Sequence, residues 1–121
     1  MSKRILVIED TEDNRTIIRD LLTSAGYEMI EAVTGEEGVE MAARHKPDLI
    51  LMDIQLPVID GYEATRRIKA NPELKAIPVI AVTSYALAGD EQKTRDAGCD
   101  GYVAKPFSPR QLLAKVREFV G

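Results

Sequence analysis

Several residue types that carry chemistry in other proteins are scarce in this chain of 121 residues. There is no tryptophan, one cysteine (Cys99) and one histidine (His45). A single cysteine excludes an internal disulfide, and a single histidine leaves one candidate base for a Cys–His or Ser–His pair. His45 stands between Arg44 and Lys46 in a pattern typical of a helix end, so we interpret it as a residue that complements the helix dipole. Cys99 is interpreted as a small packed residue.

Long apolar runs and an excess of basic charge are also missing. No run approaches the roughly 20 apolar residues that a membrane-spanning helix needs. The net charge of -4, from 20 acidic and 16 basic side chains, lacks the basic stripe of a nucleic-acid binder. Residues 1–4 lead directly into an apolar run, so we expect no signal peptide. We therefore expect a cytoplasmic protein that binds neither a membrane nor nucleic acid directly.

The apolar residues instead form short runs that alternate with helical patterns along the whole chain. Three of the five runs are continuous stretches of Ile, Leu and Val, which is typical of parallel strands covered on both faces. The second run is more mixed and fits a strand at the edge of the sheet. The predicted strands are Arg4–Glu9, Tyr27–Ala32, Asp48–Asp53, Pro78–Thr83 and Gly101–Ala104.

Helices are predicted in the gaps between these strands. Thr34 with Glu37, and Ser108 with Gln111, have the spacing of capping boxes that open helices. Five β-α units with right-handed crossovers predict one flavodoxin-like, doubly wound α/β sandwich over residues 1–121, with five parallel strands in the order 2-1-3-4-5. The predicted helices are Asp13–Ser24, one opened by Thr34, one from Asp60 that ends before Asn71-Pro72, Asp90–Ala97, and one opened by Ser108-Pro109.

Two of the apolar runs end in acidic residues. Glu9 and Asp10 follow the first strand, and Asp53 ends the third. In the expected strand order these acids meet at the crevice formed by the carboxyl ends of the first and third strands. Acids at strand ends often cap a helix or stay solvated, but three close carboxylates resist joint ionisation and favour a bound cation.

Oxygen ligands without histidine or cysteine select a hard ion, and Mg²⁺ fits this pattern. We predict Asp10 and Asp53 as direct ligands. Glu9 would bind directly or through a water, and the backbone carbonyl of Gln55 would supply a further oxygen.

The last two strands also end in polar residues, Thr83-Ser84 and Lys105-Pro106. A carboxylate beside Mg²⁺ can attack phosphorus, so Asp53 is a candidate to form an aspartyl phosphate. Such a transfer needs positioning and neutralised charge above all. The amine of Lys105 would neutralise a phosphoryl oxygen, the Thr83 hydroxyl would donate to another, and the small Ser84 leaves room for the phosphate.

Over essentially its whole length the chain resembles a receiver domain of the response regulators of two-component signalling. The spacing of an aspartate, a proline and a glycine after the third strand, joined to the other strand-end residues, is highly specific. The residues that carry the resemblance are Glu9-Asp10, Asp53 with Pro57 and Gly61, Thr83-Ser84 and Lys105-Pro106.

This resemblance implies roles for the strand-end residues. Asp53 would be the phosphoacceptor, Mg²⁺ would bind the three acids, and Thr83 and Lys105 would sense the phosphate. A cis peptide is implied between Lys105 and Pro106, which an X-Pro bond adopts at modest cost. Such a domain is a phosphoacceptor that assists its own phosphorylation and dephosphorylation, and is not an enzyme in the usual sense.

The resemblance also implies a switch. Thr83 would move toward the phosphate, and Tyr102 would turn inward into the space that this motion leaves. Gln55, Ser84 and Tyr85 would control the access of water and so the lifetime of the phosphate.

The partners follow from the same resemblance. The donor would be a sensor histidine kinase or a histidine phosphotransfer protein, and the chain would be a monomer or a phosphorylation-dependent dimer. Its output would pass to a downstream protein through the surface from the fourth helix to the fifth, where Arg95, Asp96 and Asp100 are candidate contacts. Because the chain ends at Gly121, just after the fifth predicted helix, we expect a stand-alone regulator.

Residues 48–57 and the pair Gly98-Cys99 resemble single-domain division-control receivers of alphaproteobacteria, and the receivers of hybrid histidine kinases have similar stretches. Residues 88–90 fit both groups, so the receiver of a hybrid kinase or phosphorelay is the alternative. A flavodoxin-like cofactor binder is a remote alternative, since residues 11–13 are acidic where a phosphate-binding loop would lie. An aspartate hydrolase would place a second aspartate two residues after Asp10, where Glu12 stands.

Overall fold

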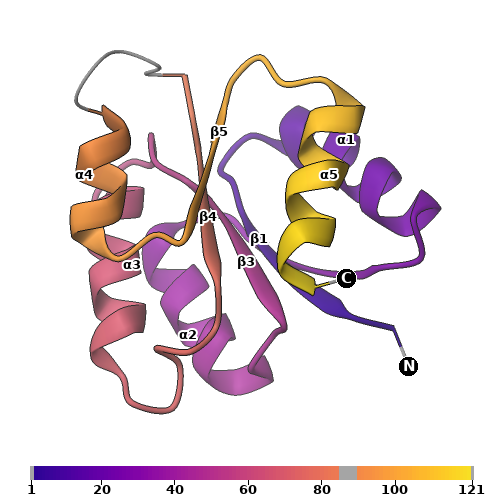
Figure 1. The fold of residues 1–121 in the computed structure, drawn as a ribbon. Coiled ribbons are helices and arrows are strands. Elements are labelled where there is room, and N and C mark those ends of the chain that lie inside the picture. Colours follow the sequence, from indigo (N-terminus) through magenta and orange to yellow (C-terminus); the bar gives the residue numbers. More distant parts are fainter. Residues whose placement is uncertain (1, 85–89, 121) are drawn as a thin grey trace.

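The computed structural model describes residues 2–84 and 90–120, and within them strands and helices alternate along the chain (Figure 1). None of the helices described is long and apolar enough to cross a membrane. The elements are β1 (Arg4–Ile8), α1 (Glu12–Ser24), β2 (Glu28–Ala32), α2 (Gly35–His45), β3 (Leu49–Asp53), α3 (Gly61–Ala70), β4 (Val79–Thr83), α4 (Asp90–Ala97), β5 (Gly101–Ala104) and α5 (Pro109–Val120).

The strands form one parallel sheet in the order β2-β1-β3-β4-β5. This confirms the predicted fold class, and β2 is an edge strand as expected. The register pairs Ile8 with Met52 and Thr83 with Ala104, so the carboxyl ends of neighbouring strands lie at one edge of the sheet. Any polar side chains that follow these strands are therefore brought together there.

Helices cover both faces of the sheet, with α1 and α5 on one side and α2, α3 and α4 on the other (Figure 1). Alternate residues of each strand point to opposite faces. In β1, Ile5 and Val7 belong to the core under α1 and α5, while Leu6 and Ile8 belong to the core under α2 and α3. Burial of each such Ile or Leu side chain stabilises the folded state by about 1.5–3 kcal/mol. This two-sided burial is what the continuous apolar runs predicted.

The predicted ends of the elements differ from the structure by one residue in several places. β1 ends at Ile8 instead of Glu9, although the Glu9 amide still donates to the Ala32 carbonyl at 3.0 Å. Strands β2, β3 and β4 each begin one residue later than predicted; before β4 the residue is Pro78, which has no amide hydrogen to donate. Helix α1 begins one residue early, at Glu12.

The predicted helix caps are present, with one change of partner. The Ser108 hydroxyl accepts from the Gln111 amide at 3.1 Å, and the Gln111 side chain accepts from the Ser108 amide at 2.9 Å. Thr34 accepts from the Glu37 amide at 3.0 Å, but the Glu37 carboxylate accepts from Val33 at 2.7 Å, one residue before the helix cap. The Ser108 and Thr34 side chains each satisfy an amide that the first helical turn leaves without a partner.

Candidate functional site

Three carboxylates lie together at the carboxyl ends of β1 and β3. One oxygen each from Glu9, Asp10 and Asp53 lies within 4.8 Å of the others. Glu9 and Asp53 are buried, with 2% and 4% of their surfaces exposed, whereas Asp10 is exposed. The parallel register of β1 and β3 produces this cluster: Ile8 pairs with Met52, so the next residues, Glu9 and Asp53, lie side by side, and Asp10 follows Glu9. The predicted gathering of the three acids is therefore present.

Lys105, just after β5, is the cation nearest to this cluster in the described structure. Its Nζ lies 3.2 Å from Glu9 Oε1 and 3.5 Å from Asp53 Oδ1. The long side chain reaches past the end of β4, the strand between β3 and β5. One amine thus touches both buried acids, which lowers the cost of keeping two charges away from water.

Asp10 has a different environment from the two buried acids. Desolvation is the largest cause that raises the pKa of its carboxyl above 3.8, and the hydrogen bond and charge of the neighbouring Glu9 add to it. The charged form of Asp10 is therefore less favourable than that of an isolated aspartate, and a cation that joins the cluster would offset this.

Backbone and side-chain donors hold the two buried acids in place. Glu9 Oε2 accepts from the Thr11 amide at 3.2 Å, and Glu9 Oε1 accepts from Asn14 Nδ2 at 3.0 Å. Asp53 Oδ1 accepts from the Gln55 amide at 3.0 Å. Sequence reasoning missed Asn14; the signal that could have found it is an amide side chain in the first turns of the helix that follows the acids.

Gln55 and Ser84 connect the ends of β3 and β4. The Ser84 amide donates to Gln55 Oε1 at 3.0 Å, so the Gln55 side chain bridges the end of β3, where Asp53 lies, to the end of β4. Thr83 ends β4 and is fully buried, and its carbonyl accepts from the Lys105 amide at 2.7 Å. The backbone carbonyl of Gln55 stays a predicted metal ligand.

The remaining predicted residues lie around these strand ends. The peptide between Lys105 and Pro106 is cis. Tyr102 of β5 is half-buried and packs against the core under α2 and α3. Tyr85 lies outside the residues that the structure describes. Cys99 is buried in that same core, where desolvation raises the pKa of its thiol to about 11, so the interpretation as a packed residue is confirmed.

Gly61, the first residue of α3, lies directly behind Asp53. A Cβ atom there would lie 2.4 Å from the Asp53 carbonyl oxygen and 2.6 Å from Ile54 Cα. The glycine amide donates to the Ile54 carbonyl at 2.9 Å. Only a residue without a side chain lets α3 pack this closely against the strand end, which explains the glycine of the sequence motif.

The donor set defines what the cluster can bind. Its ligand atoms are carboxylate oxygens, which suit a hard cation such as Mg²⁺ better than zinc or copper. The adjacent Lys105 amine suits a phosphoryl group. Residues that fit both partners lie at one edge of the sheet.

A groove of about 480 Å³ opens beside the cluster, between α1 and the loop after β5. Its far wall is apolar, and Ile17 leaves 55% of its surface exposed there. The groove is lined by Glu9, Asn14, Ile17, Ile18, Ser84, Lys105, Pro106 and Phe107.

Residues 5–117 match the response regulator receiver domain family, and this chain belongs to that family. The polar-differentiation response regulator DivK of Brucella ovis is 44% identical over 121 residues, which cover 100% of this chain and 98% of the relative. The DivK protein of Brucella anthropi matches to the same extent.

Solved structures agree with this assignment. The receiver domain of sensor histidine kinase PA1611 from Pseudomonas aeruginosa, which has a magnesium ion in its active-site cleft, is 40% identical, with a TM-score of 0.92 over 100% of this chain and 99% of that one. The chemotaxis protein CheY4 of Vibrio cholerae is 26% identical, with a TM-score of 0.93 over 98% and 99% of the two chains. The cofactor-binding and hydrolase alternatives are thereby set aside.

Proposed function

We propose that this chain is a stand-alone, single-domain response regulator that accepts a phosphoryl group on Asp53 in a Mg²⁺-dependent reaction. The donor is the phosphohistidine of a sensor histidine kinase or a histidine phosphotransfer protein. The observation that carries the proposal is the cluster of Glu9, Asp10 and Asp53 with Lys105 between its two buried members. The full-length likeness to DivK supports a regulator without a fused output domain.

The chain's own residues account for the chemistry. A carboxylate oxygen of Asp53 attacks phosphorus, and the bond from phosphorus to the donor's imidazole nitrogen breaks with its electron pair kept by that nitrogen. The Lys105 amine stabilises the charge on the phosphoryl oxygens. The Thr83 hydroxyl donates to a further phosphoryl oxygen.

Mg²⁺ would be held by Glu9, Asp10, Asp53 and the carbonyl of Gln55. When bound, the ion neutralises the acids and the incoming phosphate. The magnesium ion in the cleft of the Pseudomonas receiver supports this choice of metal.

The groove beside the cluster is the proposed approach route of the donor. Ile17 and Phe107 offer apolar contact next to Glu9 and Lys105, so an apolar side chain beside the phosphohistidine would bury both partners' surfaces there. Water access to the phosphate would then depend on Gln55, Ser84 and Tyr85.

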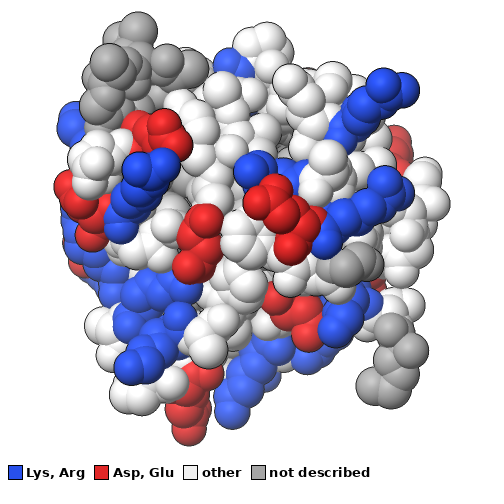
Figure 2. All heavy atoms as spheres, viewed as in Figure 1, with Lys and Arg blue, Asp and Glu red and all other residues white. Residues whose placement is uncertain are grey.

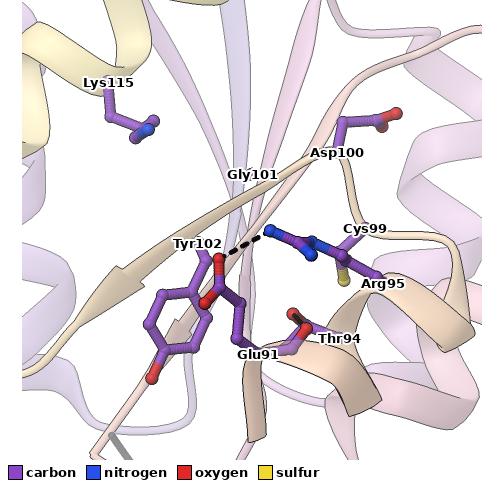
Figure 3. A pocket seen from close by; sticks show the side chains of 8 residues that line it. All are labelled: Glu91, Thr94, Arg95, Cys99, Asp100, Gly101, Tyr102 and Lys115. Atoms are coloured by element: carbon purple, nitrogen blue, oxygen red, sulfur yellow. Dashed lines mark hydrogen bonds and ion pairs between the residues drawn. The ribbon is translucent and has the colours of Figure 1, made fainter.

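The output surface lies over α4, β5 and α5, where Figure 2 shows acidic and basic side chains interspersed. A pocket of about 220 Å³ lies there, and Tyr102 lines it together with Arg95 and Asp100 (Figure 3). Movement of Thr83 toward the phosphate, followed by inward rotation of Tyr102, would reshape this pocket for a protein partner or a second copy of the chain. Asp96 lies on α4, the helix that also carries Arg95, and its carboxylate accepts from Gln92 Nε2 at 2.9 Å.

The second candidate function is that of a receiver within a hybrid histidine kinase or phosphorelay. The 40% identity to the receiver domain of sensor histidine kinase PA1611 favours it. The acceptor chemistry is the same in both cases, and the difference lies in the source of the phosphoryl group and in the output.

Intact mass spectrometry after incubation with Mg²⁺ and acetyl phosphate tests the acceptor. We expect one phosphoryl adduct on the wild type and none on Asp53→Asn, because an amide is a poor nucleophile toward phosphorus. Asp96→Asn makes the same chemical change on exposed α4 and should keep the adduct. An adduct that persists in Asp53→Asn would contradict the assignment.

A further inference from the structure

Arg15, in the first turns of α1, touches the backbone that carries the metal-binding acids. Its Nη1 donates to the Glu9 carbonyl at 2.9 Å, and its Nε lies 3.3 Å from Glu31 Oε1 on β2. Only 14% of the Arg15 side chain is exposed. One planar guanidinium therefore connects the end of β1 to the neighbouring edge strand.

The Glu9 carbonyl belongs to the peptide unit that joins Glu9 to Asp10. A trans peptide is rigid and planar and contains both Cα atoms, so an anchor on its oxygen orients the attachment points of both acids. The preceding peptide is anchored as well, because the Glu9 amide donates to the Ala32 carbonyl at 3.0 Å. The turn after β1 is thus held on both sides of Glu9.

We propose that Arg15 is a positioning residue for the metal site, acting through the Glu9–Asp10 peptide. It holds both acids so that their oxygens converge with Asp53, and the Glu31 carboxylate in turn orients Arg15. This inference rests on the proposed function and adds to it a residue that touches neither metal nor phosphate. Partners that orient metal ligands commonly change metal affinity by 10–100-fold when they are lost.

The chain contains a matched control for this role. Arg19 also binds Glu31, with its Nε 3.0 Å from Glu31 Oε2, but it lies one helical turn further along α1. Arg15→Lys and Arg19→Lys both keep the positive charge and both disturb a pair with Glu31. Only the first change loses the planar fork in which Nε and Nη1 point to different acceptors, one of them the Glu9 carbonyl.

The test is the dissociation constant for Mg²⁺, measured by isothermal titration calorimetry on the wild type and the two lysine variants. We expect Arg15→Lys to raise it about tenfold and Arg19→Lys to leave it close to the wild-type value. Saturating Mg²⁺ should restore phosphoryl adduct formation in Arg15→Lys, because the acceptor itself is intact. Unchanged affinity in Arg15→Lys, or an equal loss in both variants, would overturn the proposal.

A second readout in metal-free protein separates this proposal from the proposed function. The NMR amide signal of Asp10, which belongs to the anchored peptide, should move in Arg15→Lys and stay in place in Arg19→Lys. An unmoved signal in Arg15→Lys overturns the positioning role whether or not the wild type binds Mg²⁺. Failure of the wild type to bind Mg²⁺ or to accept a phosphoryl group counts against the proposed function instead.

Discussion

The acidic site and the proposed output surface differ in how many of their residues are buried. Strands β3 and β4, which carry Asp53 and Thr83, bury all five of their residues. Strand β5 buries one residue of four, and Thr94 and Ala97 are the buried residues among the described side chains of α4. Extensive burial keeps reacting groups in fixed positions, whereas a surface held by few buried groups shifts at small cost in free energy.

This difference in burial indicates how the charge of a phosphoryl group on Asp53 would alter the proposed output surface. A phosphate can shift an equilibrium only by its differential stabilisation of one state. Because few buried groups hold the surface around α4 and many hold the strand ends, we expect that limited free energy to act on the proposed output surface and to leave Asp53 in place. Four experiments test this difference between the strand ends and the surface around α4.

We expect the largest loss of stability for Gly61→Ala, which changes the glycine that packs behind Asp53. The added Cβ would lie 2.4 Å from the Asp53 carbonyl oxygen, so the backbone itself must shift. We expect a loss of about 3 kcal/mol in the free energy of unfolding, measured by urea denaturation. Gly26→Ala is the control, since its Cβ would meet nothing within 4 Å and only its positive φ opposes the change. Equal losses in the two variants would show that packing behind Asp53 is not tight.

Without a bound metal ion, repulsion among the three acids should lower the stability of the folded state. Mg²⁺ at 100 times its dissociation constant should stabilise the wild type by about 2.7 kcal/mol. Asp10→Asn should raise the metal-free unfolding midpoint, because it removes a carboxyl whose pKa is raised by desolvation and by Glu9, and it should abolish most of the gain from Mg²⁺. Thermal denaturation with and without Mg²⁺ checks both; a lower metal-free midpoint in the variant would contradict the electrostatic account.

The raised pKa of Asp10 also predicts a pH dependence of stability. The folded state holds the Asp10 proton more tightly than the unfolded state does, so this carboxyl stabilises the metal-free fold below pH 3.8 and loses that effect as pH rises through its raised pKa. Mg²⁺ binds the ionised form and should therefore bind more weakly as pH falls into that window. Urea midpoints with and without Mg²⁺, taken across this range, should converge on acidification in the wild type. In Asp10→Asn we expect less pH dependence.

We expect the smallest loss of stability for a substitution on the proposed output surface. Arg95 pairs with Glu91 at 2.9 Å, and both side chains are more than half exposed. Removing the pair with Arg95→Ala should cost less than about 0.5 kcal/mol in urea denaturation and leave adduct formation unchanged. A loss as large as that of Gly61→Ala would show that α4 is held as firmly as the acceptor, and the contrast would fail.

Much of the fold could be predicted because local signals agreed with one another. Continuous apolar runs marked the strands, and the pattern of caps at Thr34 and Ser108 marked helix starts, with errors of one residue at the ends. The strand-end acids Glu9, Asp10 and Asp53 could be placed together because parallel strands end at one edge. Asn14 and Arg15 were missed, because their role depends on which groups lie opposite them.

The fold class and the identity of the groups at the sheet edge could be inferred from the sequence alone, because the spacing of apolar residues and the turn chemistry are local properties of the chain. How those groups are connected depends on the packing of the folded chain. Lys105 touches both buried acids, Gln55 bridges to Ser84, and Arg15 anchors the Glu9 carbonyl. Each of these contacts joins separate elements, and its existence depends on distances of a few ångströms that are set when the sheet and helices pack.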